Sequence, residues 1–441
     1  MAVAFSQSQC VLEALKAKIA DKSALVGVIG LGYVGLPFAV EKAKVGYKVH
    51  GIEQNSQRAA MVNEGDNYIC DVDDSELARV VSEGALHAVT DFERIVEMDV
   101  IVVCVPTPLH KNLSPDLQYV LNVTREIAKR LRPGQLVSLE STTYPGTCEE
   151  VMLPILESSG LKVDIDFYLA HSPERVDPGN KRYTTKNTHK VVGGVGPRSL
   201  DAATAFYGQT ILNVVPVSSA KAAEMTKVFE NTFRAVNIAL VNEMTMLCDK
   251  IGLNVWEVLD AAFTKPFGIM PFYPGPGVGG HCIPLDPHYL EWKARQINFT
   301  TRFIGLAGEI NRAMPAFVVD KARRCLNSMG VALSRSKVLV LGAAYKKDID
   351  DWRESPAIEV MKLLMEDGAT VSYHDPFVLS VNEEDVSLVS VPLTHLDKYD
   401  LVLIATDHTD IDYSKVVKES KHVLDTRNAT KDLFGANVTV L

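Results

Sequence analysis

The chain has few of the features that mark disulfide-rich, metal-binding or membrane proteins. Its seven cysteines among 441 residues are scattered, with no CxxC pair, so we expect a reducing compartment, no disulfide framework and no bound metal. No apolar run approaches the roughly 20 residues of a membrane span, and the first twenty residues lack the basic segment of a signal peptide. We therefore expect a cytoplasmic protein with no membrane partner.

Positive charge is also scarce. Lysine and arginine number 45 against 55 acidic residues, for a formal net charge of −10, which argues against nucleic acid as a partner. A small anionic ligand stays compatible, because a local site can be basic in an acidic protein. What the chain does have is 47% hydrophobic residues, over a length that predicts two or three globular domains.

Strand and helix patterns alternate in the first half of the chain. Residues 1–24 indicate an amphipathic helix with Leu12, Leu15 and Ile19 on one side. From residue 25 onward, short β-branched runs alternate with helical patterns, which predicts a parallel, doubly wound sheet.

Residues 219–251 contain no proline or glycine and carry apolar residues at helical spacing. They predict either one helix of about 33 residues or two helices with a break that the pattern does not reveal. One helix would suit a spine between domains or a subunit interface. The next segment, 265–287, is rich in glycine and proline, which predicts close approach to a ligand. We expect Phe267, Phe272, Tyr273 and Ile283 to anchor it.

A second strand–turn–helix–strand pattern begins at residue 337. Its turn keeps only Gly342, so we do not expect it to grip a pyrophosphate. The predicted fold is therefore α/β, with two doubly wound Rossmann-like domains joined by a long central helix. The expected parts are an N-terminal helical extension (1–24), a first Rossmann domain (25–214), a central helical domain that contains the glycine-rich segment (215–315) and a second Rossmann-like domain (316–441).

A GxGxxG turn follows the first predicted strand and opens a helix. Glycines there permit a tight turn and close approach of the backbone to a pyrophosphate at the helix N-terminus. Glu53 ends the second strand, where an acid accepts hydrogen bonds from ribose hydroxyls and repels a 2′-phosphate, so we expect NAD and not NADP. The turn residues expected to contact the cofactor are Gly30, Gly32, Tyr33, Val34 and Gly35.

Two further cofactor contacts are open between alternatives. Arg58 either stacks on the adenine or is a solvated helix arginine. Thr107 ends a strand inside Pro-Thr-Pro, where it either contacts the cofactor, as the rule for carboxyl ends of parallel strands suggests, or belongs to an ordinary stiff turn.

Cys282 follows two glycines in the glycine-rich segment. Its thiolate would attack an aldehyde to give a thiohemiacetal that can lose a second hydride, unless it is a small buried hydrophobe, as most cysteines are. Lys227 and Asn231 share a helix face and either stabilise an oxyanion or are simply solvated. Asp286 is a candidate general base for water, and His281 is left without a role.

Together these segments resemble the UDP-glucose/GDP-mannose dehydrogenase family over essentially the whole chain after residue 24. The stretches that carry the resemblance are VGVIGLGYVGLPFA, CVPTP, ESTTYPGT, SPERVDPG, KVFENTFRAVNIALVNE, PGPGVGGHCIPLDPHYL and AAYKKDIDDWRESP. The residues in these motifs are most similar to those of the bacterial branch that acts on UDP-N-acetylglucosamine.

The resemblance implies oxidation of a UDP-sugar C6 hydroxyl to a carboxylate with two NAD molecules in succession. Cys282 matches the catalytic cysteine, and Lys227 with Asn231 matches the oxyanion-stabilising pair. Asp286 and Thr143 match the residues that manage water and proton transfer, with Thr143 also near the cofactor.

The resemblance also implies that residues 25–214 bind NAD, that residues 215–315 form the dimerisation domain with the catalytic loop, and that residues 316–441 bind the UDP-sugar. It implies a set of binding residues as well. Arg353 matches a residue near the nicotinamide end of the cofactor. The residues expected to bind the sugar nucleotide are Glu174, Arg175, Lys227, Asn231, Arg234, Phe272, Tyr273, Gly275, Gly279 and Lys346. Arg234 is expected to act in its own subunit or across a homodimer or larger homo-oligomer.

Two positions depart from the glucose-specific members. Asp177 lies one residue closer to Glu174 than their second glutamate, and Ser141 replaces a lysine. Both departures favour a sugar pocket that differs from that of UDP-glucose, which leaves UDP-N-acetylglucosamine, UDP-N-acetylmannosamine and UDP-glucose open in that order. The rival functions are a two-electron dehydrogenase of the 6-phosphogluconate or hydroxyacid type and a non-catalytic NAD-binding regulator.

Overall fold

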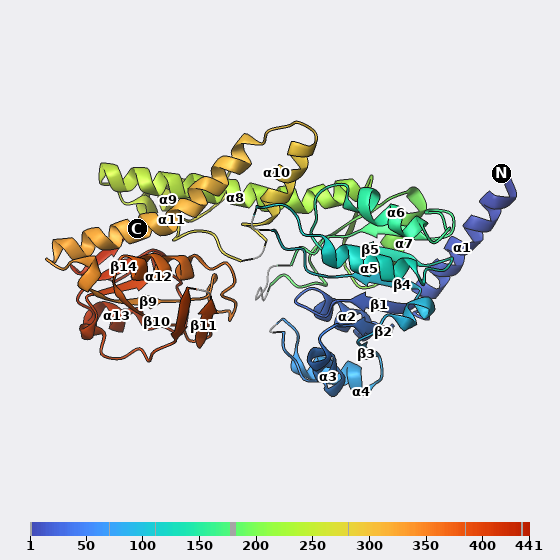
Figure 1. Ribbon diagram of the computed structural model, residues 1–441, viewed down its shortest axis with the longest axis horizontal. Coiled ribbons are helices and arrows are strands. Elements are labelled where there is room, and N and C mark those ends of the chain that lie inside the picture. The colour runs from blue at the N-terminus through green and yellow to red at the C-terminus, as the bar shows by residue number, and fades with distance from the viewer. Residues whose placement is uncertain are drawn as a thin grey trace. The chain divides into compact units, whose positions relative to one another are not determined.

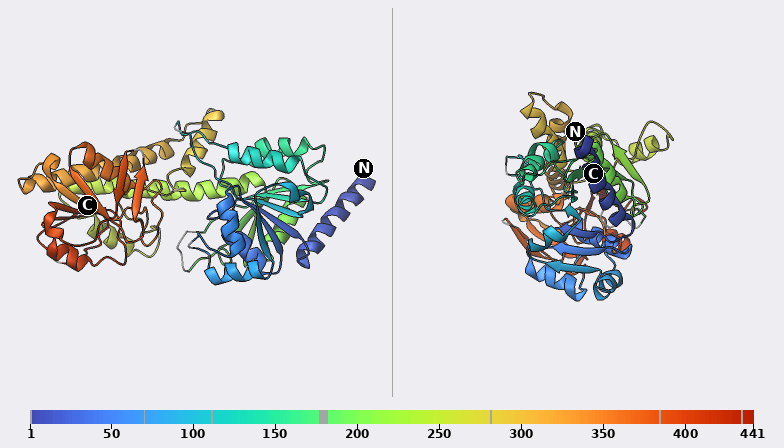
Figure 2. Two further views of the ribbon diagram at one scale, coloured as in Figure 1. Left: turned by 60° about the horizontal axis from the view of Figure 1, so that its bottom comes forward. Right: turned by 90° about the vertical axis from the view of Figure 1, so that its right-hand side faces the viewer.

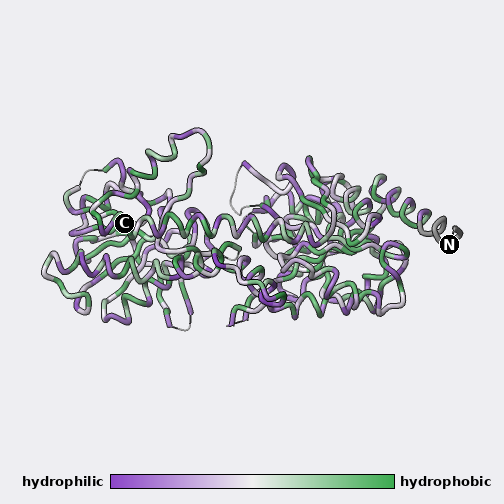
Figure 3. The backbone as a smooth tube through the Cα atoms, turned by 90° about the horizontal axis from the view of Figure 1, so that it is seen from above, coloured by the Kyte–Doolittle hydropathy of each residue, from purple (hydrophilic) through white to green (hydrophobic). Residues whose placement is uncertain are grey.

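The computed structural model describes residues 2–69, 71–110, 112–176, 182–280, 282–383, 385–433 and 435–441. These residues form two compact units. The first contains the chain up to Glu230 together with Trp292–Ile297, and the second contains Asn231–Glu291 and Asn298–Leu441. Hydrophobic segments run through the middle of each unit (Figure 3).

An eight-stranded sheet forms the centre of the first unit (Figure 1). Its strands lie in the order β3-β2-β1-β4-β5-β6-β7-β8, and the first six follow the order of dinucleotide-binding sheets. The strands are β1 (Leu25–Ile29), β2 (Lys48–Ile52), β3 (Leu86–Val89), β4 (Val100–Val103), β5 (Leu136–Leu139), β6 (Tyr168–His171), β7 (Lys190–Gly194) and β8 (Val214–Val217).

Helices cover both faces of this sheet (Figure 2). Alternate residues of β4 enter two separate cores: Val100 and Val102 pack with α1, α2, α3, α4 and α7, whereas Ile101 and Val103 pack with α5 and α6. The expected doubly wound arrangement is therefore present. The helices are α1 (Ala2–Ala20), α2 (Gly35–Lys44), α3 (Ser56–Glu64), α4 (Asp74–Ser82), α5 (Gln118–Ala128), α6 (Leu153–Glu157) and α7 (Pro197–Tyr207), with shorter turns η1 (Glu93–Glu97) and η2 (Cys148–Met152).

The pairing of β6 with β7 differs from the all-parallel sheet that the sequence predicted. Ala170 pairs with Gly194 and His171 with Gly193 in antiparallel register. A parallel neighbour needs a crossover that returns the chain to the edge where the previous strand began. Here the chain enters β7 from the edge where β6 ended, so β7 runs in the opposite direction.

A single helix, α8 (Ala220–Ile251), runs from the first unit into the second. Its 32 residues match the expectation of one long helix and rule out two helices with a break. Asn254 ends the following turn and caps α9 (Val255–Phe263) by accepting a hydrogen bond from Trp256 N.

A five-stranded parallel sheet forms the centre of the second unit, in the order β10-β9-β13-β14-β15. Numbered within the sheet this is 2-1-3-4-5, the other common doubly wound order, whose ligand position lies where the order reverses, between β9 and β13. The strands are β9 (Lys337–Leu341), β10 (Thr370–His374), β13 (Leu401–Ile404), β14 (Val423–Asp425) and β15 (Val438–Val440), with a separate hairpin of β11 (Ser380–Glu383) and β12 (Val386–Val389).

Two cores lie on opposite faces of this second sheet, because Val338 and Val340 enter one and Leu339 and Leu341 the other. None of the described helices is long and apolar enough to cross a membrane. The remaining helices are α10 (Asp286–Gln296), α11 (Arg302–Ser328), α12 (Pro356–Glu366) and α13 (Tyr413–Glu419), with η3 (Leu333–Arg335) and η4 (Leu396–Lys398).

Candidate active site

The glycine turn between β1 and α2 has the geometry of a pyrophosphate cradle. Gly30 has φ +89°, and a Cβ on Gly35 would lie 1.8 Å from Gly30 O, so both positions require glycine. A Cβ on Gly32 would meet no described atom within 4 Å, which leaves this side of the turn open to a ligand. Since no described side chain caps the start of α2, the turn fits the diphosphate of a dinucleotide.

Glu53 lies directly after β2 and is bonded to that turn. Its carboxylate accepts a hydrogen bond from Leu31 N at 3.1 Å and another from Asn55 N at 2.9 Å. A carboxylate offers about four acceptor positions, so Glu53 keeps capacity for ribose hydroxyls. Arg58 is exposed on α3 with its guanidinium 5.5 Å from the ring of Tyr68.

Thr107 and Thr143 belong to adjacent loops at the carboxyl edge of the sheet. The Thr107 hydroxyl donates to Thr142 O at 2.7 Å. Thr143 is buried, and its Oγ1 has no partner among the described residues. A buried hydroxyl without a partner is costly, so this position fits a polar group of a bound ligand.

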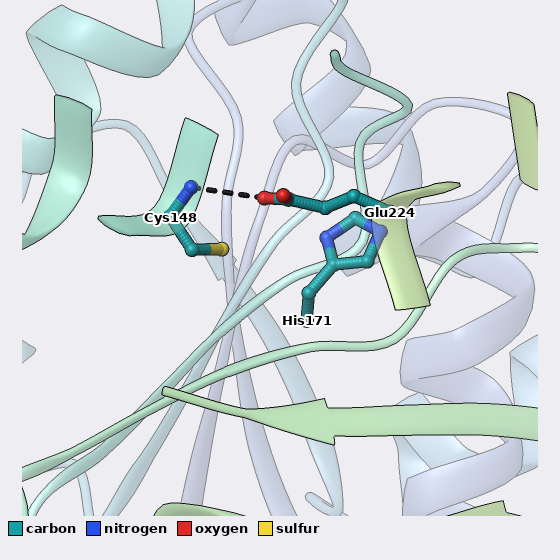
Figure 4. A group of neighbouring side chains, drawn as sticks. All are labelled: Cys148, His171 and Glu224. Atoms are coloured by element: carbon teal, nitrogen blue, oxygen red, sulfur yellow. Dashed lines mark hydrogen bonds between the residues drawn. The ribbon is translucent and has the colours of Figure 1, made fainter. Parts of the chain in front are cut away.

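Glu224 on α8 fixes the loop that carries Thr143. It accepts hydrogen bonds from Gly146 N at 2.5 Å and from Cys148 N at 2.9 Å. Figure 4 shows its carboxylate beside the sulfur of Cys148 and the ring of His171, and their ligand atoms all lie within 4.8 Å of one another. Because both carboxylate oxygens accept from backbone N–H groups, we assign Glu224 to holding the loop. Burial raises the pKa of Glu224 to about 7.

Glu174 lies three residues beyond β6 in a buried charge cluster. Lys190 donates to Glu174 Oε2 at 2.9 Å and to Glu140 Oε2 at 2.8 Å. Burial opposes ionisation of Glu174, but Lys190 and two backbone N–H groups lower its pKa. The neighbouring Arg175, expected to bind substrate, forms an ion pair with Glu230 at 2.6 Å.

Lys227 and Asn231 lie on successive turns of α8 and are both buried, so the alternative of a solvated pair is wrong. The Asn231 amide donates to the carboxylate of Asp286, and Arg234 donates to Asn231 Oδ1. Asp286 is itself buried at the start of α10. The second unit therefore brings three of the predicted residues into direct contact.

Cys282 is exposed and outside the core, so it is not one of the small buried hydrophobes. Its carbonyl accepts a hydrogen bond from Asp286 N at 2.9 Å, which places the two residues one turn apart. The preceding glycines fix the loop: a Cβ on Gly279 would lie 2.8 Å from Glu354 O, and Gly280 N donates to Arg353 O at 3.3 Å. The cysteine loop is thus held against the segment that contains Arg353.

The turn after β9 lies where the strand order of the second sheet reverses. Asp375 accepts hydrogen bonds from Ala343 N at 2.7 Å and Ala344 N at 3.0 Å, so these two donors are already used, in keeping with a turn that does not grip a pyrophosphate. Lys346 follows two residues later. The guanidinium of Arg353 pairs with Asp351 at 2.6 Å.

The aromatic residues of the glycine-rich segment behave differently from one another. Phe272 packs against the ring of Phe233, and Tyr273 stacks on Trp256 at 5.9 Å. Phe267 is 70% exposed, so the expectation that it anchors the segment is wrong. Gly275 lies close to Arg427, since an added Cβ would lie 2.5 Å from its Nη1.

Lys190, Glu140 and Glu224 were missed in the sequence. Lys190 opens the otherwise apolar strand β7, and a charged residue in a fully buried strand needs a partner; that was the available signal. Ser141 is buried and donates to Val105 O at 2.7 Å. Asp177 and His281 lie outside the described residues.

Comparisons with known proteins cover almost the whole chain. Models of the UDP-glucose/GDP-mannose dehydrogenase family match three successive parts: its NAD binding domain at residues 24–211, its central domain at 221–313 and its UDP binding domain at 339–432. The UDP-N-acetyl-D-mannosamine dehydrogenase of Pyrococcus horikoshii is 35% identical over 413 residues, which cover 92% of this chain and 96% of that protein.

A second relative is named for another sugar, and a solved structure also matches the chain. The UDP-N-acetyl-D-glucosamine 6-dehydrogenase of Pseudomonas aeruginosa is 35% identical over 394 residues, 88% of this chain and 92% of its own. The solved structure of the Pyrococcus horikoshii UDP-D-ManNAc dehydrogenase matches with a TM-score of 0.86 at 33% identity, covering 94% of this chain and 98% of that one. The chain therefore belongs to the UDP-glucose/GDP-mannose dehydrogenase family and is an NAD-dependent oxidoreductase.

Proposed function

We propose that the protein oxidises the C6 hydroxyl of a UDP-N-acetylhexosamine to a carboxylate, with Cys282 as a covalent nucleophile. The observation that carries this proposal is the exposed thiol of Cys282 on a glycine loop packed against the Arg353 segment. Glycine at positions 279 and 280 gives a substrate access to the backbone there. Family membership supplies the reaction class.

UDP-N-acetylglucosamine is the first substrate to test, because the residues in the motifs resemble those of the branch that acts on it. Relatives of equal identity are named for N-acetylmannosamine and N-acetylglucosamine, and another for an N-acetylgalactosaminuronic acid. Their common feature is the 2-acetamido group, which supports an N-acetylhexosamine. UDP-N-acetylmannosamine is the second candidate and UDP-glucose the third.

Bound NAD would accept one hydride in each of two oxidations. In the first, the C6 hydroxyl loses a hydride and a proton to become an aldehyde, and the Lys227 ammonium with the Asn231 amide stabilises negative charge on its oxygen. The Cys282 thiolate then bonds to the aldehyde carbon and forms a thiohemiacetal. Loss of the second hydride leaves a thioester on Cys282.

Hydrolysis completes the proposed reaction. Asp286, whose carboxylate accepts from Asn231, takes a proton from water, which attacks the thioester carbon and releases the acid and the Cys282 thiol. Thr143 contributes its hydroxyl to these proton transfers and to the cofactor. Glu174 lies at the reacting carbon as an ionised hydrogen-bond acceptor.

The remaining predicted residues are proposed to bind the two ligands. Glu53 holds the adenosine ribose, with Arg58, Thr107 and the glycine turn beside it, and Arg353 reaches the nicotinamide end. The residues proposed for the sugar nucleotide are Arg175, Arg234, Phe272, Tyr273, Gly275, Gly279 and Lys346.

The first test counts NADH released per sugar consumed, over a panel of UDP-sugars. Two NADH per sugar, with the uronic acid as product, is the expected result. One NADH per sugar would refute the four-electron oxidation in favour of a two-electron dehydrogenase. NAD binding without turnover on any UDP-sugar would favour a regulator.

The second test replaces Cys282 with alanine. Since no thioester can form, we expect acid production to be lost while the affinity for NAD stays within about twofold of native. Cys325→Ala, which changes a buried cysteine of the same unit, is the control. An unaltered acid yield from Cys282→Ala would remove the covalent role.

We also propose a cytoplasmic homodimer that uses α8. Phe229, Phe233, Leu240, Leu247 and Ile251 are exposed, and at 100° per residue they fall within ~40° of one another around the helix. A row of five exposed apolar side chains on one helix is typical of a protein interface. The scattered spacing of the cysteines in the sequence favours a reducing compartment.

A further inference from the structure

Lys190 lies between two carboxylates at the carboxyl edge of the first sheet. Its Nζ is 2.8 Å from Glu140 Oε2 and 2.9 Å from Glu174 Oε2. The side chains of Lys190, Glu140 and Glu174 are 4%, 0% and 16% exposed, so Glu174 is the most accessible of the three. The three residues come from three strands: Glu140 follows β5, Glu174 follows β6 and Lys190 begins β7.

We call Lys190, Glu140 and Glu174 the triad. Both of its carboxylates accept further hydrogen bonds. Glu140 Oε1 accepts from the hydroxyl of Tyr207 at 2.9 Å, and that hydroxyl is 2.8 Å from Ser138 Oγ. Glu174 Oε1 accepts from its own neighbours Arg175 N and Val176 N, both at 2.8 Å. Every oxygen of the two carboxylates therefore has a donor, and the direction of the Glu174 carboxylate is fixed by contacts to both its oxygens.

We propose that Lys190 is a positioning residue that keeps Glu174 ionised and aimed, and that Glu140 is the second anion against which this charge is balanced. The proposal rests on the proposed function, in which Glu174 meets the reacting carbon of the sugar. A glutamate held in this way serves as a hydrogen-bond acceptor or base at neutral pH and not as a proton donor.

Among the residues that the structure describes near these carboxylates, the other cations do not take the place of Lys190. Burial lowers the pKa of Lys42 on α2, and its ammonium group donates to Phe206 O. Burial also lowers the pKa of His171 on β6 to about 3, so its ring is neutral near pH 7. On the remaining elements, burial raises the pKa of Cys104 after β4 and of Tyr207 on α7.

Arg175 is the nearest remaining cation in sequence. Its guanidinium is directed to Glu230 at 2.6 Å and to His189 O at 2.6 Å. Glu174 and Arg175 are adjacent, but the Arg175 charge is neutralised by its own partner. Burial raises the pKa of Glu140, and Lys190 opposes this rise. Without Lys190, two buried carboxylates would face each other, and the pKa of both, Glu174 included, would rise.

The test compares the pH dependence of kcat/KM for NADH release among the native enzyme, Lys190→Met and Glu140→Gln. Lys190→Met should raise the pKa of Glu174. The value of kcat/KM should then fall as the pH is lowered between about pH 8 and pH 5. Each unit by which the pKa of Glu174 exceeds the assay pH lowers the ionised fraction of Glu174 about tenfold. Glu140→Gln removes the other carboxylate, so Lys190 interacts with Glu174 only. The pH below which kcat/KM falls should therefore stay at its native value or move lower.

Lys190→Arg is the conservative control, because it keeps the charge and should restore the native profile. Shifts of the same sign in Lys190→Met and Glu140→Gln, or no shift in either, would overturn the proposal. A loss of packing alone would affect Lys190→Met and Glu140→Gln alike. Only a charge effect predicts different shifts of the pH profile when a cation and when an anion is removed.

A second measurement is independent of turnover and is made on the native protein, with one variant used only to assign the signal. In full-length protein with NAD, labelled with carboxyl-¹³C glutamate, the Glu174 resonance is identified by its loss in Glu174→Gln. A titration midpoint below the ~4.3 of an unperturbed glutamate supports the proposal, and a midpoint above it overturns it. No NADH from any UDP-sugar would refute the proposed function, while this titration still decides what Lys190 does.

Discussion

Glu53 and Asp375 occupy the same place in their two sheets, directly after the second strand of each fold. Asp375 accepts two backbone N–H groups of its turn and bonds to His408 at 3.0 Å. Burial alone would raise the pKa of Asp375, but these donors lower it to about 2. Glu53 takes only one N–H from its turn, that of Leu31. Asp375 thus occupies the N–H groups of its neighbouring turn, whereas Glu53 leaves the glycine turn open to a ligand.

Replacing Glu53 with alanine should weaken NAD binding and relax the discrimination against NADP. Each lost hydrogen bond from a ribose hydroxyl to the carboxylate is worth about 1.5–3 kcal/mol, so the Kd for NAD should rise at least about tenfold. Calorimetric titration with NAD and NADP measures both effects, with Glu53→Gln as the isosteric control. Unchanged affinities for both dinucleotides would place Glu53 outside the site.

Replacing Glu224 with glutamine should change how stability depends on pH. Burial raises the folded-state pKa to about 7 from 4.5, so the folded protein holds a proton that the unfolded chain has released between these values. Native stability therefore falls as pH rises through this window, by up to about 3 kcal/mol, and the glutamine variant lacks this fall. Unfolding midpoints at pH 5 and pH 8 measure it; an identical pH response in both proteins would contradict the raised pKa.

Whole elements depend on positions where only glycine fits. The turn before α2 needs Gly35 because a Cβ would overlap Gly30 O, whereas Gly32 faces open space. The sequence predicted this turn, and it predicted that the α8 segment is helical, because both depend on neighbours within a few residues. Whether α8 is one helix or two was left open. It did not predict the reversed strand β7, because its direction depends on how the chain returns to the sheet.

The two glycines should separate folding from cofactor binding. Gly35→Ala should destabilise the unit by about 1–3 kcal/mol or more through steric overlap. Gly32→Ala should leave the melting temperature unchanged but weaken NAD about tenfold or more, since its methyl group would occupy space where the pyrophosphate approaches. Thermal melts and NAD titrations of both variants test this; an unaltered NAD affinity in Gly32→Ala would locate the pyrophosphate elsewhere.

At the scale of the whole molecule, α8 has two chemically different sides. Its buried side carries Lys227 and Asn231, and its exposed side carries the apolar row from Phe229 to Ile251. A helix that is apolar on an exposed face gains stability by covering that face with another protein surface.

Introducing charge into this row should dissociate the proposed dimer. In the double variant Leu240→Glu and Leu247→Glu, each protomer would place two carboxylates in the interface, so we expect light scattering to give the mass of a single chain. Lys418→Glu, at an exposed position on α13, should leave the mass unchanged. A native protein of monomeric mass at micromolar concentration would contradict the proposal.

The sequence by itself determined the dinucleotide turn, the two α/β folds and the family, because these depend on local periodicity and on motifs that are contiguous in the chain. The structure decided that α8 is one unbroken helix. Only the tertiary structure decided that Lys190 joins Glu140 to Glu174, that Glu224 holds the Gly146–Cys148 loop and that Asp286 contacts Asn231. These contacts link residues from 16 to 78 positions apart. Such partners are selected by burial, which requires every enclosed charge to find a counter-charge or a hydrogen bond wherever in the chain it lies.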